Sequence, residues 1–122
     1  MKLATNVVRR GDIFLVSLDP VRGSEQGKTR PCVVIQNDVG NDHSPVTIIA
    51  CITSNLGRKE YPTNVCISAH ETGLDCDSVV LLNQIRTVDK TRLLRRIGRV
   101  PDYKLIEIDE ALKISLGMQL GF

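Results

Sequence analysis

The chain has 122 residues and a formal net charge of +2, with hydrophobic residues at 42% and charged residues at 25%. A chain of this length can build one hydrophobic core without metals or disulfides, and the composition excludes disordered and fibrous classes. No apolar run approaches the roughly 20 residues of a membrane span, and the N-terminus lacks the apolar stretch of a secretory signal. We therefore expect one cytosolic domain over residues 1–122, with no membrane contact.

Six short runs rich in β-branched residues predict strands. They are separated by glycine, proline and asparagine and lie at residues 12–18, 31–37, 46–53, 64–68, 78–88 and 95–100. Several of these runs are apolar on both faces rather than alternating. This pattern favours a small curled sheet or barrel whose outer face is covered by a helix or a partner chain.

A helix is predicted after the last strand. Pro101 and Asp102 mark its start, with Asp102 as the expected N-cap. Apolar residues then recur at spacings of three and four, which predicts one buried helix face: Leu105, Ile108, Leu112 and Leu116. A shorter helical turn is expected to begin at Asp89. The elements together predict a mainly β protein, a small antiparallel β-barrel with a terminal amphipathic helix.

The chain contains four cysteines, Cys32, Cys51, Cys66 and Cys76. The first three lie inside apolar strand-like runs, where a thiol serves as a small hydrophobic group, so we expect buried free thiols rather than structural disulfides. Cys66, His70 and Cys76 lack the paired spacings typical of zinc sites, and His43 is isolated in a polar segment. We therefore expect no metal and no other cofactor.

Basic residues gather in one part of the sequence. Between positions 86 and 99 a single acid, Asp89, accompanies six bases: Arg86, Lys90, Arg92, Arg95, Arg96 and Arg99. The segment from Asp102 onward holds more acids than bases. We expect one part of the fold to carry a positive field suited to a polyanion; the alternative is a solvated surface.

Most catalytic templates are missing: there is no glycine-rich phosphate loop, no zinc-protease motif and no Ser/His/Asp set. What remains is a group of polar residues at strand ends and in one strand: Ser24, Glu25, Gln26, Arg30, Thr53, Ser54, Gln84, Arg86 and Thr87. A charge in mid-strand must reach solvent, a carboxylate or a ligand, so Arg86 is a candidate ligand contact. The alternatives are a salt bridge on a sheet edge for Arg86, a solvated residue for Arg30 and a β-propensity choice for Thr53.

Four segments follow one another from about Arg10 to Leu116: "RRGDIFLVSLDPVRGSEQGKTRPCVVIQND", "VTIIACITS", "LLNQIRTVDKTRLLRRIGRV" and a closing helix. Their order resembles the MazF/PemK family of toxin endoribonucleases. The most specific pieces are "GSEQGKTRP" and "QIRTVDK". The resemblance implies an SH3-like antiparallel barrel of the MazF/PemK/CcdB type, a homodimer, and metal-independent, sequence-specific cleavage of single-stranded RNA that inhibits translation. It also implies a cognate acidic, MazE-like antitoxin.

By the same resemblance, the catalytic arginine falls on Arg30, the catalytic threonine on Thr53, and the loop's glutamate and glutamine on Glu25 and Gln26. Asn83 stands where many relatives carry an acid, which puts in doubt a base readout that requires a carboxylate there. Donors to phosphates and base edges complete the expected RNA-binding set: Ser24, Gln26, Lys28, Ser54, Arg58, Gln84 and Arg86.

This interpretation implies attack by the RNA's own 2′-hydroxyl on the adjacent phosphate, with Arg30 and Thr53 stabilising the added negative charge. Glu25 is the alternative base, and its other role would be to orient Arg30 through a salt bridge. Other functions remain open. A gyrase-poisoning toxin of the CcdB kind shares the fold class but acts by binding a protein, whereas a non-catalytic RNA-binding barrel would leave RNA uncut.

Overall fold

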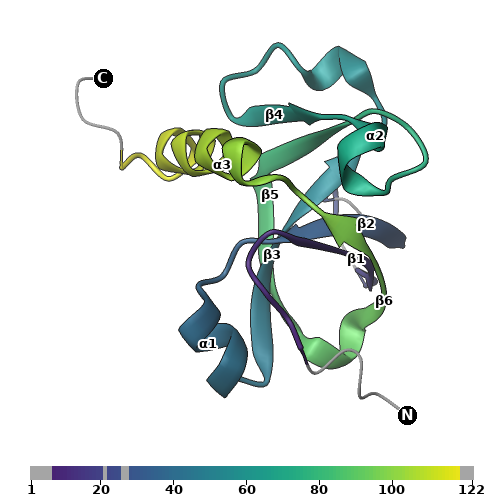
Figure 1. Ribbon diagram of the computed structural model, residues 1–122, viewed down its shortest axis with the longest axis vertical. Coiled ribbons are helices and arrows are strands. Elements are labelled where there is room, and N and C mark those ends of the chain that lie inside the picture. The colour runs from purple at the N-terminus through teal and green to yellow at the C-terminus, as the bar shows by residue number, and fades with distance from the viewer. Residues whose placement is uncertain (1–6, 21, 26–27, 119–122) are drawn as a thin grey trace.

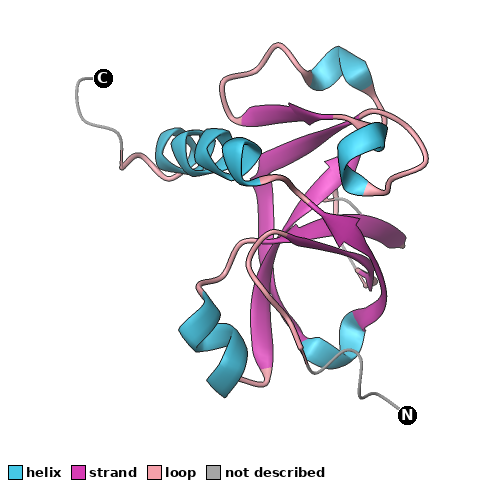
Figure 2. Ribbon diagram, in the orientation of Figure 1, coloured by secondary structure: helices cyan, strands magenta, loops and turns pink. Residues whose placement is uncertain are grey.

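The computed structural model describes residues 7–20, 22–25 and 28–118, so the expected RNA-binding residue Gln26 lies outside the described part. The elements of this part are β1 (Asp12–Ser17), β2 (Thr29–Val34), α1 (Asp38–His43), β3 (Val46–Thr53), the 3-10 turn η2 (Leu56–Arg58), β4 (Asn64–Ile67), α2 (Ala69–Thr72), β5 (Ser78–Asp89), the 3-10 turn η3 (Lys90–Arg92), β6 (Leu93–Arg99) and α3 (Asp102–Ser115). In Figures 1 and 2, β3 and β5 run along the middle of the molecule, with α3 beside β4 and β5 and α1 at the opposite end.

The strands form one antiparallel sheet in the order β4-β5-β3-β2-β1-β6. This mainly β architecture with a C-terminal helix confirms the predicted class. Register shifts interrupt the pairing of β1 with β6 and, between Ala50 and Cys51, that of β3 with β5. Such bulges bend a sheet and increase its twist. Among the described strands, β4 and β6 remain unpaired edges, so the sheet is curled but open and a closed barrel is not confirmed.

The sheet is buried on both faces along β1, β3 and the first half of β5, as the strand sequences predict. Because neighbouring side chains alternate along a strand, Ile13 belongs to one hydrophobic cluster and Phe14 to the other. The first cluster includes Ile108 and Ala111 of α3, whereas the second contains no residue of that helix. The helix therefore covers one face, and the curled sheet with Val8 encloses the other.

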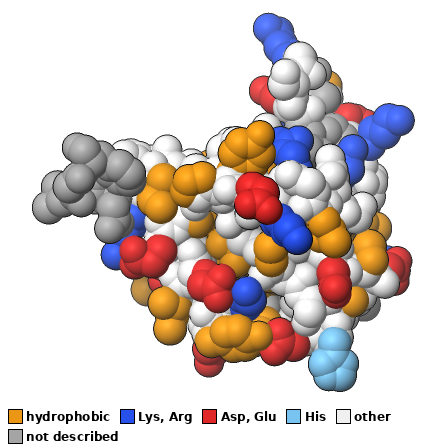
Figure 3. Space-filling view, turned by 90° about the horizontal axis from the view of Figure 1, so that it is seen from above, with side chains coloured by type: hydrophobic (Ala, Val, Ile, Leu, Met, Phe, Trp, Pro, Cys, Tyr) orange, Lys and Arg blue, Asp and Glu red, His pale blue; other side chains and the backbone are white. Residues whose placement is uncertain are grey.

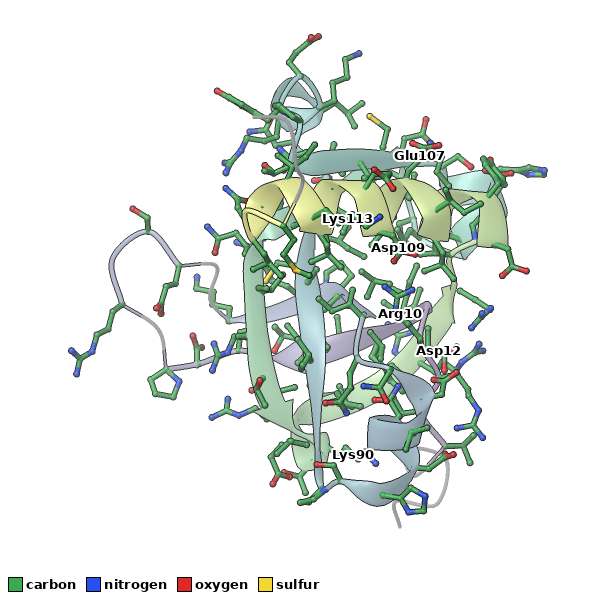
Figure 4. The ribbon with its side chains drawn as sticks, turned by 90° about the vertical axis from the view of Figure 1, so that its left-hand side faces the viewer. Arg10, Asp12, Lys90, Glu107, Asp109 and Lys113 are labelled. Carbon is green, nitrogen blue, oxygen red and sulfur yellow. The ribbon has the colours of Figure 1, made fainter. Side chains whose placement is uncertain are left out.

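The predicted helix forms, but its ends differ from expectation. Pro101, in an extended conformation, occupies the N-cap position and makes no side-chain capping bond, so the prediction of Asp102 as N-cap is wrong. Proline fits there because it lacks a backbone N–H. The prediction that Leu116 belongs to the buried helix face is also wrong: the helix ends at Ser115, and Leu116, at the C-cap, is 54% exposed. Arg10 ties α3 to the sheet by donating to Asp109 at 2.5 Å (Figure 4).

Two short helices were not predicted. Each is stabilised at its start by a side chain that accepts a backbone N–H: Asn37 accepts from Gly40 in α1, and Ser68 accepts from Glu71 in α2. Both helices are too short and polar to show hydrophobic periodicity. The helical turn expected at Asp89 is confirmed as η3, because the Asp89 carboxylate accepts from the Thr91 N–H at 2.9 Å.

The cysteines divide into two pairs by exposure. Cys32 and Cys51 are buried, as predicted, whereas Cys66 and Cys76 are exposed. The prediction for Cys66 is wrong because β4 is an edge strand whose side chains alternate, and this residue lies on its outward face between buried Val65 and Ile67. None of the described helices is long and apolar enough to span a membrane.

Candidate active site

The loop between β1 and β2 is fastened at its stem. The Leu18 N–H donates to the Lys28 carbonyl at 2.7 Å, and the Lys28 N–H donates to the Asp19 carboxylate at 2.7 Å. Gly23 and Lys28 both have a positive φ, which turns the backbone sharply. Ser24 and Glu25 are exposed, and the Glu25 carboxylate accepts from the Arg22 N–H at 2.7 Å. The loop thus exposes polar groups to solvent, while hydrogen bonds hold its stem in place.

Two arginines from distant parts of the chain hold this stem. Arg86 of β5 donates to the Leu18 carbonyl at 2.8 Å, and Arg92 of η3 donates to the carbonyls of Ser17 at 3.1 Å and Asp19 at 2.5 Å. β4 pairs with β5 only over residues 78–81, so Arg86 lies where β5 is paired with β3 alone. The expected sheet edge is therefore present, but in place of the expected salt bridge the Arg86 guanidinium donates to a backbone carbonyl.

Arg30 and Thr53 are brought to neighbouring strand ends. β2 pairs with β3 so that Cys32 lies opposite Cys51. Arg30 precedes Cys32 by two residues in β2, and Thr53 follows Cys51 by two residues in β3. Because side chains alternate along a strand, each lies on the same face as the cysteine of its own strand. Both side chains are half-buried, and the Thr53 hydroxyl accepts from the Asn55 N–H at 3.2 Å. β2 begins at Thr29 rather than at residue 31 as predicted, so Arg30 belongs to the strand.

Two pockets open around these strands. The first, of about 250 Å³, is lined by Arg30, Ser54 and Arg95 together with Leu15, Pro31, Ile52, Gly73, Leu74, Asp75, Cys76, Ser78 and Ile97. The second, of about 280 Å³, is lined by Glu25, Gln84 and Arg86 together with Pro20, Cys51 and Ile85. Each pocket thus combines at least one guanidinium with smaller polar groups, a composition that suits phosphates and base edges.

Arginines from both pockets affect the pKa of one buried thiol, Cys51. A hydrogen bond from the Cys32 thiol lowers the pKa of Cys51, and the positive charges of Arg86 and Arg30 lower it further against the opposing effect of burial. Because both guanidinium groups act on the same sulfur, their charges converge on this part of the sheet. A positive potential here favours an anionic ligand.

The structure brings some predicted site residues together and separates others. Glu25, Gln84 and Arg86 share one pocket, whereas Arg30 and Ser54 share the other. Ser24 and Lys28 are exposed on the loop. Arg58 lies on η2 beyond the end of β3, where its carbonyl accepts from the Asn64 amide at 2.6 Å, and it lines neither of these two pockets.

Arg95 was not predicted as a site residue, although it lines the same pocket as Arg30. It reaches that position because Leu15 of β1 pairs with Arg95 on one side and with Pro31 on the other. The sequence signals only that Arg95 belongs to a basic run. Its proximity to β2 follows from the strand order, which the sequence does not reveal.

The rest of the basic run does not form one positive surface. Arg96 and Arg99 donate to the buried carboxylate of Asp12 at 3.0 and 3.3 Å, and Lys90 donates to the Asn41 carbonyl. The face seen in Figure 3 mixes acidic, basic and hydrophobic side chains. Of the basic run, Arg95 lines the pocket of Arg30, and Arg86 lines the second pocket. Among the described residues, no group of three or more His, Cys, Asp or Glu side chains is placed to hold a metal ion.

A curled antiparallel sheet with a C-terminal helix, arginine-lined pockets and a polar β1–β2 loop defines a small, mainly β protein whose site suits an anionic ligand. The family described as PemK-like, MazF-like toxin of type II toxin-antitoxin system matches residues 9–116. The Staphylococcus epidermidis protein named endoribonuclease MazF is 51% identical over 112 residues, which cover 92% of this chain and 93% of that protein. This chain therefore belongs to the PemK/MazF family of toxins.

Solved structures agree with this assignment. MazF from Deinococcus radiodurans is 28% identical, covers 92% of this chain and 98% of its own, and superposes with a TM-score of 0.78. A MazE–MazF structure from the same organism is 29% identical over 93% of this chain and 98% of its own, with a TM-score of 0.73.

Proposed function

We propose that this chain is an endoribonuclease toxin that cleaves single-stranded RNA at short sequences and thereby inhibits translation. The observation that carries the proposal is the 51% identity, over 92% of the chain, to a protein named endoribonuclease MazF. The convergence of Arg30 and Arg86 on one part of the sheet supports it, because RNA cleavage requires cations at the phosphate that reacts.

The proposed reaction uses the substrate's own nucleophile. The 2′-hydroxyl attacks the adjacent phosphorus, the bond to the 5′-oxygen breaks, and the products are a 2′,3′-cyclic phosphate and a free 5′-hydroxyl. The protein must hold the in-line geometry and stabilise the negative charge that accumulates on the phosphoryl oxygens. Arg30 is the proposed cation because its planar guanidinium can donate to two phosphate oxygens at once.

Thr53 and Glu25 have separate proposed roles. The Thr53 hydroxyl accepts from the Asn55 N–H, which leaves its own proton for donation to a phosphate oxygen in the proposed mechanism. A guanidinium stays protonated near neutral pH and is therefore a poor base, so Glu25 is the alternative proton acceptor. Glu25 lines the pocket of Arg86 rather than that of Arg30. This arrangement supports a function for Glu25 next to the neighbouring nucleotide and gives no support to a salt bridge with Arg30.

The RNA strand is proposed to run across the two pockets. Ser24 and Lys28 on the loop and Ser54 beside Arg30 would contact phosphates, whereas Gln84 and Arg86 would read a base edge. Asn83 supplies no carboxylate, so any readout there must use its amide. Arg58 is proposed to contact the strand further along. Gln26 keeps its proposed role, and its position lies outside the described residues.

Regulation and assembly follow the family pattern in this proposal. The chain would act as a single domain with an SH3-like barrel, as a homodimer in the cytoplasm. A small acidic antitoxin would lay a tail over Arg30 and the β1–β2 loop, in competition with RNA. The MazE–MazF structure from Deinococcus radiodurans supports the existence of such a complex.

Primer extension on total RNA tests the proposed activity. Incubation with the purified chain is expected to give discrete stops at one short sequence, and the new 5′ ends should accept phosphate from polynucleotide kinase because they carry hydroxyls. Arg30→Ala, purified identically, is the control for contaminating nucleases. Uncut RNA under conditions where the folded chain binds RNA would contradict the proposal and favour a non-catalytic binding protein.

A further inference from the structure

Two buried thiols face each other beneath the proposed catalytic residues. Cys32 of β2 and Cys51 of β3 are direct partners in the antiparallel register, and both are free. Cα atoms of directly opposed residues in such a pair lie about 4.5 to 5.5 Å apart, within the range of about 4.4 to 6.8 Å that disulfides span. Both cysteines also belong to one hydrophobic cluster, so their side chains occupy the same face. The backbone is therefore already arranged for a cross-strand disulfide.

A small oxidant has a route to one of these sulfurs. Cys32 is 0% exposed and Cys51 is 2% exposed to bulk solvent. However, Cys51 lines the pocket of about 280 Å³ that also contains Glu25 and Arg86. Hydrogen peroxide is little larger than water and fits such a space, whereas glutathione does not reach a side chain this deeply buried. The pocket thus selects small hydroperoxides.

The two thiols differ in reactivity. The pKa of Cys51 is lowered by the hydrogen bond from Cys32 and by the charges of Arg86 and Arg30, although burial opposes the shift. The pKa of Cys32 is raised well above its ordinary value by that same hydrogen bond and by burial. The Cys32 thiol also lies 3.6 Å from the Arg30 carbonyl, a second acceptor for its proton. Cys51 lines the pocket and has the lower pKa of the two, so it is the sulfur that attacks the oxidant, and Cys32 is the thiol that follows.

We propose that Cys32 and Cys51 form a reversible, peroxide-driven disulfide that lowers the activity of the adjacent site. The Cys51 thiolate attacks one peroxide oxygen, the O–O bond breaks, hydroxide leaves and a sulfenic acid forms. The Cys32 sulfur then attacks the Cys51 sulfur, the S–O bond breaks, and the departing hydroxide takes up a proton. Overall, two thiols lose two electrons and two protons, and one peroxide becomes two waters.

The effect on activity rests on the proposed function. Arg30 and Thr53 are each two residues from a cysteine and lie on the same face. A disulfide holds its Cβ atoms about 3.8 Å apart, closer than the roughly 4.5 to 5.5 Å of an ordinary cross-strand pair, so the strands must shift. A misplacement of about 1 Å at a catalytic group costs on the order of a hundredfold in rate. We expect the oxidised protein to cleave RNA at least about tenfold more slowly.

The test uses the full chain with the exposed thiols removed, as Cys66→Ala/Cys76→Ala, so that only the buried pair can react. Trypsin leaves Cys32 and Cys51 in one peptide, residues 29–58, because Arg30 precedes Pro31 and no other lysine or arginine lies between Lys28 and Arg58. After treatment with hydrogen peroxide, that peptide should lose two hydrogen atoms in mass, and dithiothreitol should restore both its mass and the cleavage rate. The same background carrying Cys51→Ala is the matched control, and it should keep its rate in peroxide.

The mass of the peptide tests whether the disulfide forms, and the cleavage rate tests whether the disulfide lowers activity. An unchanged mass, or stepwise gain of oxygen without loss of hydrogen, would overturn the disulfide while leaving the proposed function intact. A complete disulfide with an unchanged cleavage rate would overturn the coupling to activity. If the reduced chain cuts no RNA, the proposed function fails, and the disulfide is then judged by the peptide mass alone. Thermal melting of each variant identifies a control that has simply lost its fold.

Discussion

The guanidinium of Arg86 donates a 2.8 Å hydrogen bond to the backbone carbonyl of Leu18, the residue at which the chain leaves β1 for the polar loop. The two residues are 68 positions apart in the sequence. The contact thus couples the middle of β5 to the stem of the loop. Because Arg86 also lines a pocket and lowers the pKa of Cys51, one side chain both orders the loop and contributes charge to the site.

Arg86→Met is expected to weaken RNA binding and loosen the loop. The substitution keeps an apolar stem but removes the charge and the bond to Leu18, which should lower the free energy of unfolding by about 1 kcal/mol. The KM for RNA should rise more than kcat falls if Arg86 acts mainly through binding. Steady-state cleavage and urea unfolding measure the two effects. Lys113→Met, which removes an exposed charge from α3, is the matched control and should leave both quantities unchanged; an equal response from both variants would contradict the assignment.

Arg30→Ala and Thr53→Val should each lower the cleavage rate by orders of magnitude with little change in melting temperature. Both residues are half-buried at strand ends and are absent from the two hydrophobic clusters, so their removal costs little packing. Arg30→Lys should also be poor, because a point ammonium cannot replace a forked donor. Single-turnover cleavage and thermal melting provide the readouts. Arg9→Ala, which removes the exposed ion pair with Asp42 and a hydrogen bond to the Val8 carbonyl, is the control; full activity in Arg30→Ala would remove that residue from the mechanism.

Gly98→Ala should destabilise the fold severely. A Cβ at this position in β6 would lie 1.8 Å from the Thr72 carbonyl oxygen, and neither backbone can retreat without breaking the pairing with β1 or the contact with α2. A loss of about 3 kcal/mol or more in the free energy of unfolding is expected. Gly117→Ala is the comparison: its Cβ would meet no atom of the described residues within 4 Å, and its positive φ is the strain expected, so about 1 kcal/mol is predicted. Urea titration of both variants checks the difference, and similar midpoints would show that the Thr72 contact relaxes easily.

The Gly98 contact also shows what sequence alone can and cannot predict. The strands are predictable because β-branched runs carry a local signal, and α3 is predictable because its apolar residues recur at helical spacing. The approach of Gly98 to Thr72, the position of Arg95 beside Arg30 and the opposition of Cys32 to Cys51 all depend on pairing between distant segments. Local sequence patterns do not determine strand order, so these three contacts could be identified only from the structure.

The same limit explains the uneven outcome for the candidate site. The glycine-flanked loop and the charge at Arg86 were visible in the sequence because both are locally unusual. That Arg86 would bind the Leu18 carbonyl rather than a carboxylate was not visible, since a backbone acceptor has no sequence signature. The roles of Arg30, Thr53 and Glu25 come from family resemblance, and they stay predictions until the variants are measured.

Cleavage should persist in excess EDTA. In the proposed mechanism the positive charge at the phosphate comes from Arg30, and the nucleophile comes from the RNA, so a divalent ion has no step to perform. The initial rate in EDTA should match the rate in magnesium at equal ionic strength, within the effect of salt on RNA binding. Loss of activity in EDTA that returns with magnesium but not with extra sodium chloride would contradict this mechanism.

A single 2′-deoxyribose on the 5′ side of the cut site should abolish cleavage while binding survives. The substitution removes the proposed nucleophile but keeps the scissile phosphate, the bases and every other 2′-hydroxyl, so Arg30, Arg86 and the loop retain their partners. The expected result is a dissociation constant within about threefold of the all-ribose oligonucleotide, well below the factor of ten that 1.4 kcal/mol represents, together with no detectable product. A deoxyribose placed one nucleotide further 3′ is the matched control and should be cut. Cleavage of the first oligonucleotide at a comparable rate would identify water as the nucleophile, and the roles given to Arg30 and Thr53 would then have to be reassigned.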